Sequence, residues 1–166
     1  MKPKLKQAYM DTAKIFAELS HAKRLHVGAI VVKEDRIISI GYNGMPAGWD
    51  NDCEYKEYIN VSNNTGEFVS WDFDQTDEDG TMYRLKTNPE VLHAETNAIA
   101  KLARSNESGL DADLFVTHAP CLDCAKLIYQ SGIRRVFYGT SYRDNHGIDF
   151  LTKSGIHVEK MDDNTT

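Results

Sequence analysis

The sequence has few cysteines and no excess of basic residues. Three cysteines among 166 residues are too few for the disulfide framework of a small secreted protein. The N-terminal stretch, Met1 to Met10, resembles neither a signal peptide nor a membrane span. Acidic residues outnumber basic ones by 25 to 19, and a net charge of −6 argues against binding many phosphates of a polynucleotide. We therefore expect a cytoplasmic protein that binds neither membranes nor nucleic acids.

The acidic residues are concentrated between positions 50 and 90. This segment holds eleven Asp or Glu against three Lys or Arg, a local charge of −8, so the rest of the chain sums to +2. It lacks a sustained apolar period, and its Asn-Asn-Thr-Gly and Asp-Glu-Asp-Gly turn signals favour a long loop. The aromatic residues Trp49, Trp71, Phe73 and Tyr83 favour a lid or a subunit contact, and a solvated acidic loop is the alternative. We predict one domain over residues 1–166 with an insertion at about 50–90.

Secondary structure is legible in the first forty residues. Apolar side chains recur every three or four positions from Leu5 to Leu19, which predicts an amphipathic helix ending near Ser20 and His21. The β-branched runs Val27–Val32 and Arg36–Ile40 then predict a hairpin.

After position 90, helix and strand patterns alternate. Residues 139–155 separate the last two strand patterns and hold a helical stretch, which favours a parallel crossover. We predict an α/β fold of three layers (αβα), with helices on both faces of a mixed five-stranded sheet whose last two strands are parallel. The expected elements are a helix headed by His93, a strand at Leu114–Thr117, a helix at Cys121 that Gly132 stops, a strand at Val136–Tyr138, a helix around Phe150 and Leu151 that Gly155 ends, and a strand around His157–Met161.

Two short motifs carry the chemistry. His93, Ala94 and Glu95 form a His-Ala-Glu triplet, and a Pro-Cys-x-x-Cys run contributes Cys121 and Cys124. One histidine and two cysteines make three zinc ligands, which leave a fourth position open for catalysis. A glutamate beside such a site, not itself a ligand, is the general acid and base of zinc-dependent nucleobase deaminases.

The cysteine pair has other interpretations. Cys121 and Cys124 can form a redox pair, or Cys53 can close a structural zinc site as a fourth ligand. Pro120 argues against the redox pair, because proline suits the first turn of a helix and would place the two sulfurs one turn apart on one face. Together with Glu95, this spacing favours the open catalytic site.

Four segments together resemble the deoxycytidylate (dCMP) deaminases, particularly those of phages. The segments are VGAIVV at 27–32, GYNGMPAG at 41–48, HAETNAI at 93–99 and THAPCLDCAKLIYQSGI at 117–133. The resemblance implies a cytidine-deaminase-like αβα fold. It also implies a hydrolase that converts dCMP to dUMP and ammonia and so supplies thymidylate synthesis.

The catalytic roles follow from the motif residues. Zinc held by His93, Cys121 and Cys124 would lower the pKa of a bound water toward about 7, and Glu95 would carry protons to the cytosine ring and the departing amine. The resemblance adds Ala94 and the carbonyl oxygen of Ala119 as substrate contacts.

Substrate recognition leaves alternatives open. Asn43 offers an amide donor and acceptor to the ribose or the pyrimidine, although Asn-Gly is also an ordinary turn signal. A nucleoside monophosphate requires a cation, for which Arg24 and Arg143 are candidates. We favour Arg143 with Tyr142, because ligands of α/β sheets gather beyond the carboxyl ends of parallel strands.

The resemblance also implies regulation. Many enzymes of this kind are hexamers activated by dCTP and inhibited by dTTP, with Mg²⁺ accompanying the triphosphate. By this resemblance we expect a homo-oligomer, and the effector to bind at Gly41, Tyr42, Asn43 and Gly44, with Tyr42 facing the effector and Asn43 the substrate. Some phage relatives hold a second zinc, but Cys53 with His21 or His26 is a weak ligand set, and His118 and His146 receive no role.

Two other functions stay in consideration. One is a deaminase of a free nucleoside or of tRNA adenosine, which the acidic balance and the proposed phosphate arginines disfavour. The other is a zinc-stabilised binding module without catalysis, in which Glu95 would have no use.

Overall fold

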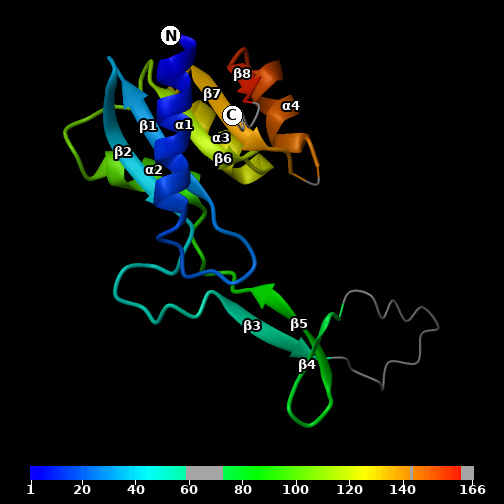
Figure 1. Cartoon of the computed structure of the whole chain (residues 1–166). Coiled ribbons are helices and arrows are strands. Elements are labelled where there is room, and N and C mark those ends of the chain that lie inside the picture. Colours follow the sequence, from blue (N-terminus) through cyan, green and yellow to red (C-terminus); the bar gives the residue numbers. More distant parts are fainter. Residues whose placement is uncertain (59–72, 143, 162–166) are drawn as a thin grey trace.

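The fold is built around one five-stranded sheet with helices on both faces (Figure 1). The computed structural model describes residues 1–58, 73–142 and 144–161. Within these ranges, no helix is both long enough and apolar enough to cross a membrane. The elements are α1 (Pro3–Ala17), β1 (Gly28–Lys33), β2 (Arg36–Tyr42), β3 (Glu54–Tyr58), β4 (Gln75–Thr76), β5 (Met82–Thr87), α2 (Ala94–Ala103), β6 (Asp113–His118), α3 (Leu122–Gln130), β7 (Arg135–Thr140), α4 (His146–Lys153) and β8 (His157–Lys160).

The strand order of the main sheet is β2-β1-β6-β7-β8. Strand β1 runs antiparallel to both β2 and β6, whereas β6, β7 and β8 are mutually parallel. Helices α3 and α4 form the two crossovers between the parallel strands, as parallel pairing requires. The predicted mixed sheet, with its last two strands parallel, is confirmed, and β6 extends the parallel part by one strand.

Alternate residues of the central strands fill two cores on opposite faces of the sheet. Ala29 and Val31 of β1 pack with α2, α3 and α4, while Ile30 and Val32 pack with α1. Phe115 of β6 stacks on Phe137 in the second core, at 4.6 Å between ring centroids. Because both faces are buried, these strands are continuous apolar runs without alternation.

Local signals fix several boundaries. The hairpin turn between β1 and β2 uses Glu34 and Asp35, both at positive φ (50° and 58°), the backbone of a type I′ turn. Gly132 and Gly155, with φ of 81° and 80°, follow α3 and α4 as predicted. Helix α1, however, ends at Ala17, before the predicted Ser20 and His21.

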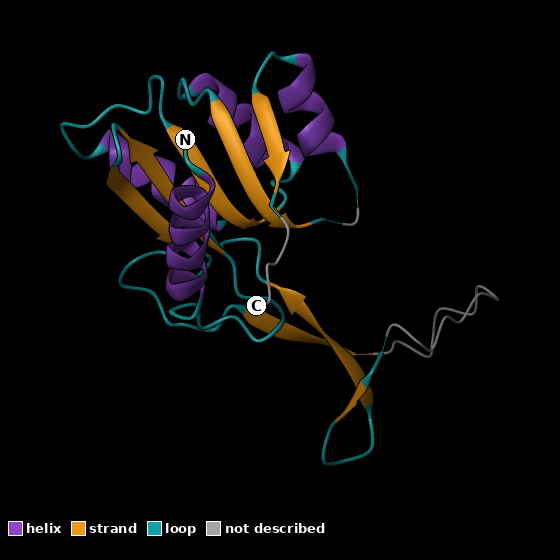
Figure 2. Cartoon of the chain, turned by 45° about the horizontal axis from the view of Figure 1, so that its top comes forward, coloured by secondary structure: helices purple, strands orange, loops and turns teal. Residues whose placement is uncertain are grey.

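A second sheet extends away from the body, as Figures 1 and 2 show. Its antiparallel strands, in the order β3-β5-β4, belong to the segment that we predicted to be an insertion. We call the described residues 54–58 and 73–87 the arm. No strand was predicted here, because polar cross-strand contacts hold the arm together. Glu57 pairs with Arg84 and Lys86, and Lys56 with Asp77. Trp71 lies outside the described residues.

Candidate active site

The N-termini of α2 and α3 bring the predicted metal ligands together. His93 caps α2 and Cys121 caps α3, while Cys124 lies in the first turn of α3. The Nδ1 atom of His93 is 3.4 Å from the Sγ atom of Cys124 and 3.6 Å from that of Cys121. Pro120 precedes the cap and lies outside the helix, which corrects our expectation of a proline in its first turn.

The geometry of this cluster fits zinc. A tetrahedral zinc ion about 2.05 Å from nitrogen and about 2.3 Å from sulfur separates the two ligand atoms by about 3.6 Å. The ligand atoms of His93, Cys121 and Cys124 all lie within 4.8 Å of one another, and among the described residues they form the one such group. Cys53 is not a member of the group and is buried elsewhere, so a closed four-ligand site is not formed by it.

The thiols of Cys121 and Cys124 have pKa values that are shifted in opposite directions. Hydrogen bonds from the Cys124 thiol and from His93 lower the pKa of the Cys121 thiol to about 4, which makes it a thiolate at neutral pH. The same contact with Cys121, together with burial, raises the pKa of Cys124. Both sulfurs would be thiolates when they hold a metal ion, because a coordinating thiol is deprotonated.

Glu95 is a buried carboxyl beside this cluster. Only 4% of its surface is exposed, and burial raises the pKa of the carboxyl from 4.5 to about 7. A hydrogen bond from its own backbone N–H and the nearby His93 act in the opposite direction but do not cancel the effect of burial. A carboxyl with a pKa near 7 can both accept and donate a proton at neutral pH.

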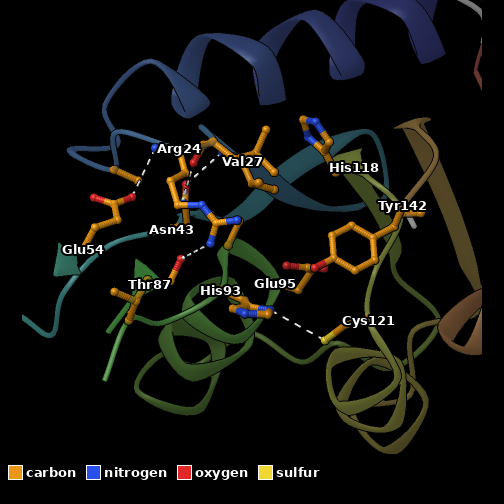
Figure 3. Close-up of a pocket in the computed structure, with 15 residues that line it drawn as sticks. Arg24, Val27, Asn43, Glu54, Thr87, His93, Glu95, His118, Cys121 and Tyr142 are labelled. Atoms are coloured by element: carbon orange, nitrogen blue, oxygen red, sulfur yellow. Dashed lines mark hydrogen bonds between the residues drawn. The ribbon is translucent and has the colours of Figure 1, made fainter. Parts of the chain in front are cut away.

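Glu95 and two members of the cluster, His93 and Cys121, line a pocket of about 470 Å³. This volume lies within the range of small-molecule sites. Figure 3 shows Glu95 and Cys121 toward one side of the pocket and Arg24, Glu54 and Thr87 toward the other. The lining residues are Ala22, Arg24, Leu25, Val27, Asn43, Glu54, Thr87, Val91, His93, Ala94, Glu95, His118, Ala119, Cys121 and Tyr142.

The predicted substrate residues are distributed unequally. Arg24, Asn43, Ala94, Ala119 and Tyr142 all line the pocket. Their roles toward a substrate stay predictions. Arg143, the arginine we favoured for the phosphate, lies outside the described residues.

Asn43 has a structural task in addition to its place in the pocket. Its Oδ1 atom accepts a hydrogen bond from the Val27 N–H at 2.8 Å, and its Nδ2 atom donates to the Leu25 carbonyl at 2.8 Å. One amide hydrogen and one oxygen lone pair remain for a ligand. Asn43 therefore holds the chain ahead of β1 in place at the edge of the pocket.

Of the predicted effector residues, Asn43 lines the pocket, whereas Gly41, Tyr42 and Gly44 are not among its lining residues. A Cβ atom on Gly41 would come within 2.1 Å of the Ala94 carbonyl oxygen, so a glycine allows α2 to pack against β2. Gly44 exchanges two backbone hydrogen bonds with Leu92, which leads into His93. The Lys101 ammonium lies 5.6 Å from the centre of the Tyr42 ring. The effector role stays a prediction.

Several pocket residues were not predicted. Glu54 and Thr87 come from the ends of the arm, and His118 from the end of β6. The Nδ1 atom of His118 lies 3.1 Å from the Thr117 hydroxyl. No spacing in the sequence relates Glu54 to Thr87, because their proximity depends on the pairing of β3 with β5.

Comparisons with known proteins agree with this geometry. The family model of the cytidine and deoxycytidylate deaminase zinc-binding region matches residues 3–140. The deoxycytidylate deaminase of Enterobacteria phage T4 is 37% identical over an alignment of 150 residues that covers 80% of this chain and 77% of that protein. The phage T2 deoxycytidylate deaminase is 36% identical over 148 residues, covering 80% of this chain and 79% of that protein.

A solved structure is similar over almost the whole chain. The dCMP deaminase of the cyanophage S-TIM5, crystallised in complex with dCMP and dUMP, is 44% identical and has a TM-score of 0.78. The match covers 97% of this chain and 99% of the cyanophage chain, so it includes the arm as well as the body.

Proposed function

Because this chain belongs to the cytidine and deoxycytidylate deaminase family, we propose that it hydrolyses dCMP to dUMP and ammonia. The observation that carries the proposal is the buried Glu95 beside three zinc ligands at one side of a pocket with a cation, Arg24, on the other. A cytosine at the first side and a monophosphate at the second would use both features.

The chemistry divides between the metal and the carboxyl. His93, Cys121 and Cys124 would hold zinc, which when bound supplies a Lewis acid that activates water. Glu95 accepts a proton from the attacking water and passes it to the N3 atom of cytosine. The water oxygen bonds to C4, the bond from C4 to the amino nitrogen breaks, and Glu95 delivers the second water proton to the departing amine, which leaves as ammonia.

Backbone groups orient the base. Ala119 follows β6, and its N–H donates to the Thr140 carbonyl at 2.8 Å, which fixes the peptide at the pocket wall. Its carbonyl would accept a hydrogen bond from the amino group of cytosine. Ala94 opens α2, where backbone N–H groups have no acceptor within the helix, and would donate to the pyrimidine oxygen.

Arg24 is the phosphate ligand that the described pocket offers. Its guanidinium makes no ion pair within the described ranges, so its charge is available to an anion. A guanidinium can bind two phosphate oxygens at once. Tyr142 would contribute a hydroxyl, and Arg143 beside it is the second candidate. We also propose that the protein acts in a reducing cytoplasm, which its three free cysteines support.

Regulation is the finer part of the proposal. We propose a homo-oligomer, a hexamer by family resemblance, activated by dCTP and inhibited by dTTP, each with Mg²⁺. The support is that Asn43 lines the pocket while the neighbouring Tyr42 does not, as expected for adjacent residues at the end of a strand. Such a pair would couple the substrate site to the effector site when the two ligands favour different states of the protein.

The test is ammonia release from dCMP, CMP and deoxycytidine by the zinc-loaded protein, alone and with dCTP or dTTP plus Mg²⁺. We expect turnover of dCMP, increased by dCTP and decreased by dTTP. Turnover of deoxycytidine in preference to dCMP would favour the nucleoside deaminase. Turnover of none of the three would overturn the proposed substrate and direct attention to tRNA adenosine.

A further inference from the structure

The chain between α1 and β1, residues 18–27, forms one wall of the pocket and carries Arg24. We call it the Arg24 loop. Asn43 fixes its C-terminal end through Leu25 and Val27, and the Ser20 hydroxyl donates to the Asn43 carbonyl at 2.8 Å near its start. The middle of the loop is held from a different direction, by the arm.

The contact is made by the two residues at the root of the arm. The carboxylate of Glu54 accepts hydrogen bonds from the backbone N–H of Lys23, at 3.0 and 3.1 Å, and from that of Arg24, at 3.2 Å. The Thr87 hydroxyl accepts a hydrogen bond from the Nη1 atom of Arg24 at 3.3 Å. Glu54 therefore fixes the backbone of the Arg24 loop, and Thr87 fixes the guanidinium of Arg24.

Glu54 and Thr87 are partners in the arm's own sheet. They face each other in the register of β3 and β5, as the first residue of β3 and the last residue of β5. Figure 1 shows this end of the two strands nearest the body. The pair Glu54 and Thr87 thus joins the arm to the Arg24 loop. Because both residues contact this loop directly, a movement of the arm's root would move Arg24 as well.

The charges of Glu54 and Arg24 bear on how this contact would act on a substrate phosphate. A carboxylate repels a substrate phosphate, and the backbone N–H groups of Lys23 and Arg24 that bond the Glu54 oxygens reduce this repulsion. The guanidinium of Arg24 is not paired with that carboxylate within the described ranges, and its bond to Thr87 is to a neutral hydroxyl. The guanidinium of Arg24 therefore lines the pocket without an ion pair to Glu54, the carboxylate that lines the same side.

We propose that Glu54 and Thr87 are positioning residues that hold Arg24 for the substrate phosphate, so that the root of the arm sets the preference for a nucleoside monophosphate over a nucleoside. The inference rests on the proposed function. An arginine already held in its binding orientation loses less conformational freedom when the phosphate arrives.

The experiment measures kcat and KM for dCMP and for deoxycytidine in the zinc-loaded protein. Glu54→Ala and Thr87→Val are expected to raise KM for dCMP about five- to tenfold, the order of the net contribution of one ordinary hydrogen bond. They should leave kcat for dCMP and both constants for deoxycytidine unchanged. Glu57→Ala is the matched control, because Glu57 lies farther along β3 than Glu54 and bonds Arg84 and Lys86 within the arm.

A double-mutant cycle separates positioning from general destabilisation. In an Arg24→Ala background, Glu54→Ala should no longer change KM for dCMP, because the group that Glu54 positions is gone. An equal effect of Glu54→Ala with and without Arg24 would overturn the proposal, as would a lower KM for dCMP, which would mean that Glu54 repels the phosphate.

The outcomes for the two proposals are distinguishable. If the wild-type protein deaminates dCMP but Glu54→Ala and Glu57→Ala act alike on both substrates, the positioning role is wrong and the function stands. If the wild-type protein does not deaminate dCMP, the proposed function is wrong and the positioning role falls with it. If Glu54→Ala lowers the melting temperature, Thr87→Val keeps the test decisive, because it leaves the carboxylate in place.

Discussion

The Nδ1 atom of His93 lies 3.4 Å from the Sγ atom of Cys124, although 31 residues separate them in the chain. The two come together because α2 and α3 pack against each other in the same core of the main sheet, and the N-terminal end of each helix carries one of the two ligands. A helix start carries unpaired backbone N–H groups, so anionic ligands such as thiolates are favoured there.

The cluster is expected to bind one zinc ion per chain. Removing the metal with a chelator should abolish activity, and added zinc should restore it. His93→Ala should weaken zinc affinity by more than about 100-fold. The loss of a residue that only hydrogen-bonds a metal ligand already lowers metal affinity by about 10- to 100-fold, and His93 is a ligand itself. Cys53→Ala is the control, because Cys53 lies outside the cluster, and it should keep a full equivalent of zinc by elemental analysis. Loss of zinc in Cys53→Ala would contradict the three-ligand site.

Gly41 is expected to be required for the position of α2. In Gly41→Ala the new methyl would clash with the Ala94 carbonyl and the Ala98 backbone, so α2 and with it His93 must shift. We expect the free energy of unfolding to fall by about 1–3 kcal/mol and zinc affinity to fall with it. Gly44→Ala is the control, because nothing lies within 4 Å of its added methyl. Urea denaturation and zinc titration of both variants measure the difference, and equal behaviour would contradict the account.

Asn43 is expected to contribute to stability apart from any role toward substrate. Asn43→Ala removes the hydrogen bonds to Val27 and Leu25, which we expect to lower the free energy of unfolding by about 1–3 kcal/mol. Denaturation without ligand measures this effect. Gln7→Ala, which loses only an exposed bond to Asp11, should change stability by less than about 0.5 kcal/mol. An Asn43→Ala protein as stable as wild type would mean that the amide serves the substrate alone.

Short-range patterns predicted the sheet and the metal ligands. The apolar runs around Ile30 and Leu114 are buried on both faces, and such runs stand out in a sequence. The spacing of His93, Cys121 and Cys124 is set by two helix starts, each of which has a local signal. These features depend on neighbours within a few residues, which a single sequence displays.

The arm and half of the pocket depend on longer-range contacts and were not predicted. Strand β3 reads Glu-Tyr-Lys-Glu-Tyr, and its stability comes from pairs such as Glu57 with Arg84 and from the rings of Tyr58 and Tyr83, 5.8 Å apart. Polar cross-strand pairs give no apolar period, so the segment resembled a loop. The roles of Glu54 and Thr87 follow only once β3 and β5 are paired. The single-domain organisation stays a prediction.

The most direct test of the central claim compares the wild-type protein with Glu95→Gln, both loaded with zinc. We expect the wild type to release one ammonia and form one dUMP for each dCMP consumed. Glu95→Gln should bind the same amount of zinc but turn over dCMP at least about a hundredfold more slowly, because an amide cannot transfer the proton. A Glu95→Gln protein that keeps both its zinc and wild-type activity would contradict the account.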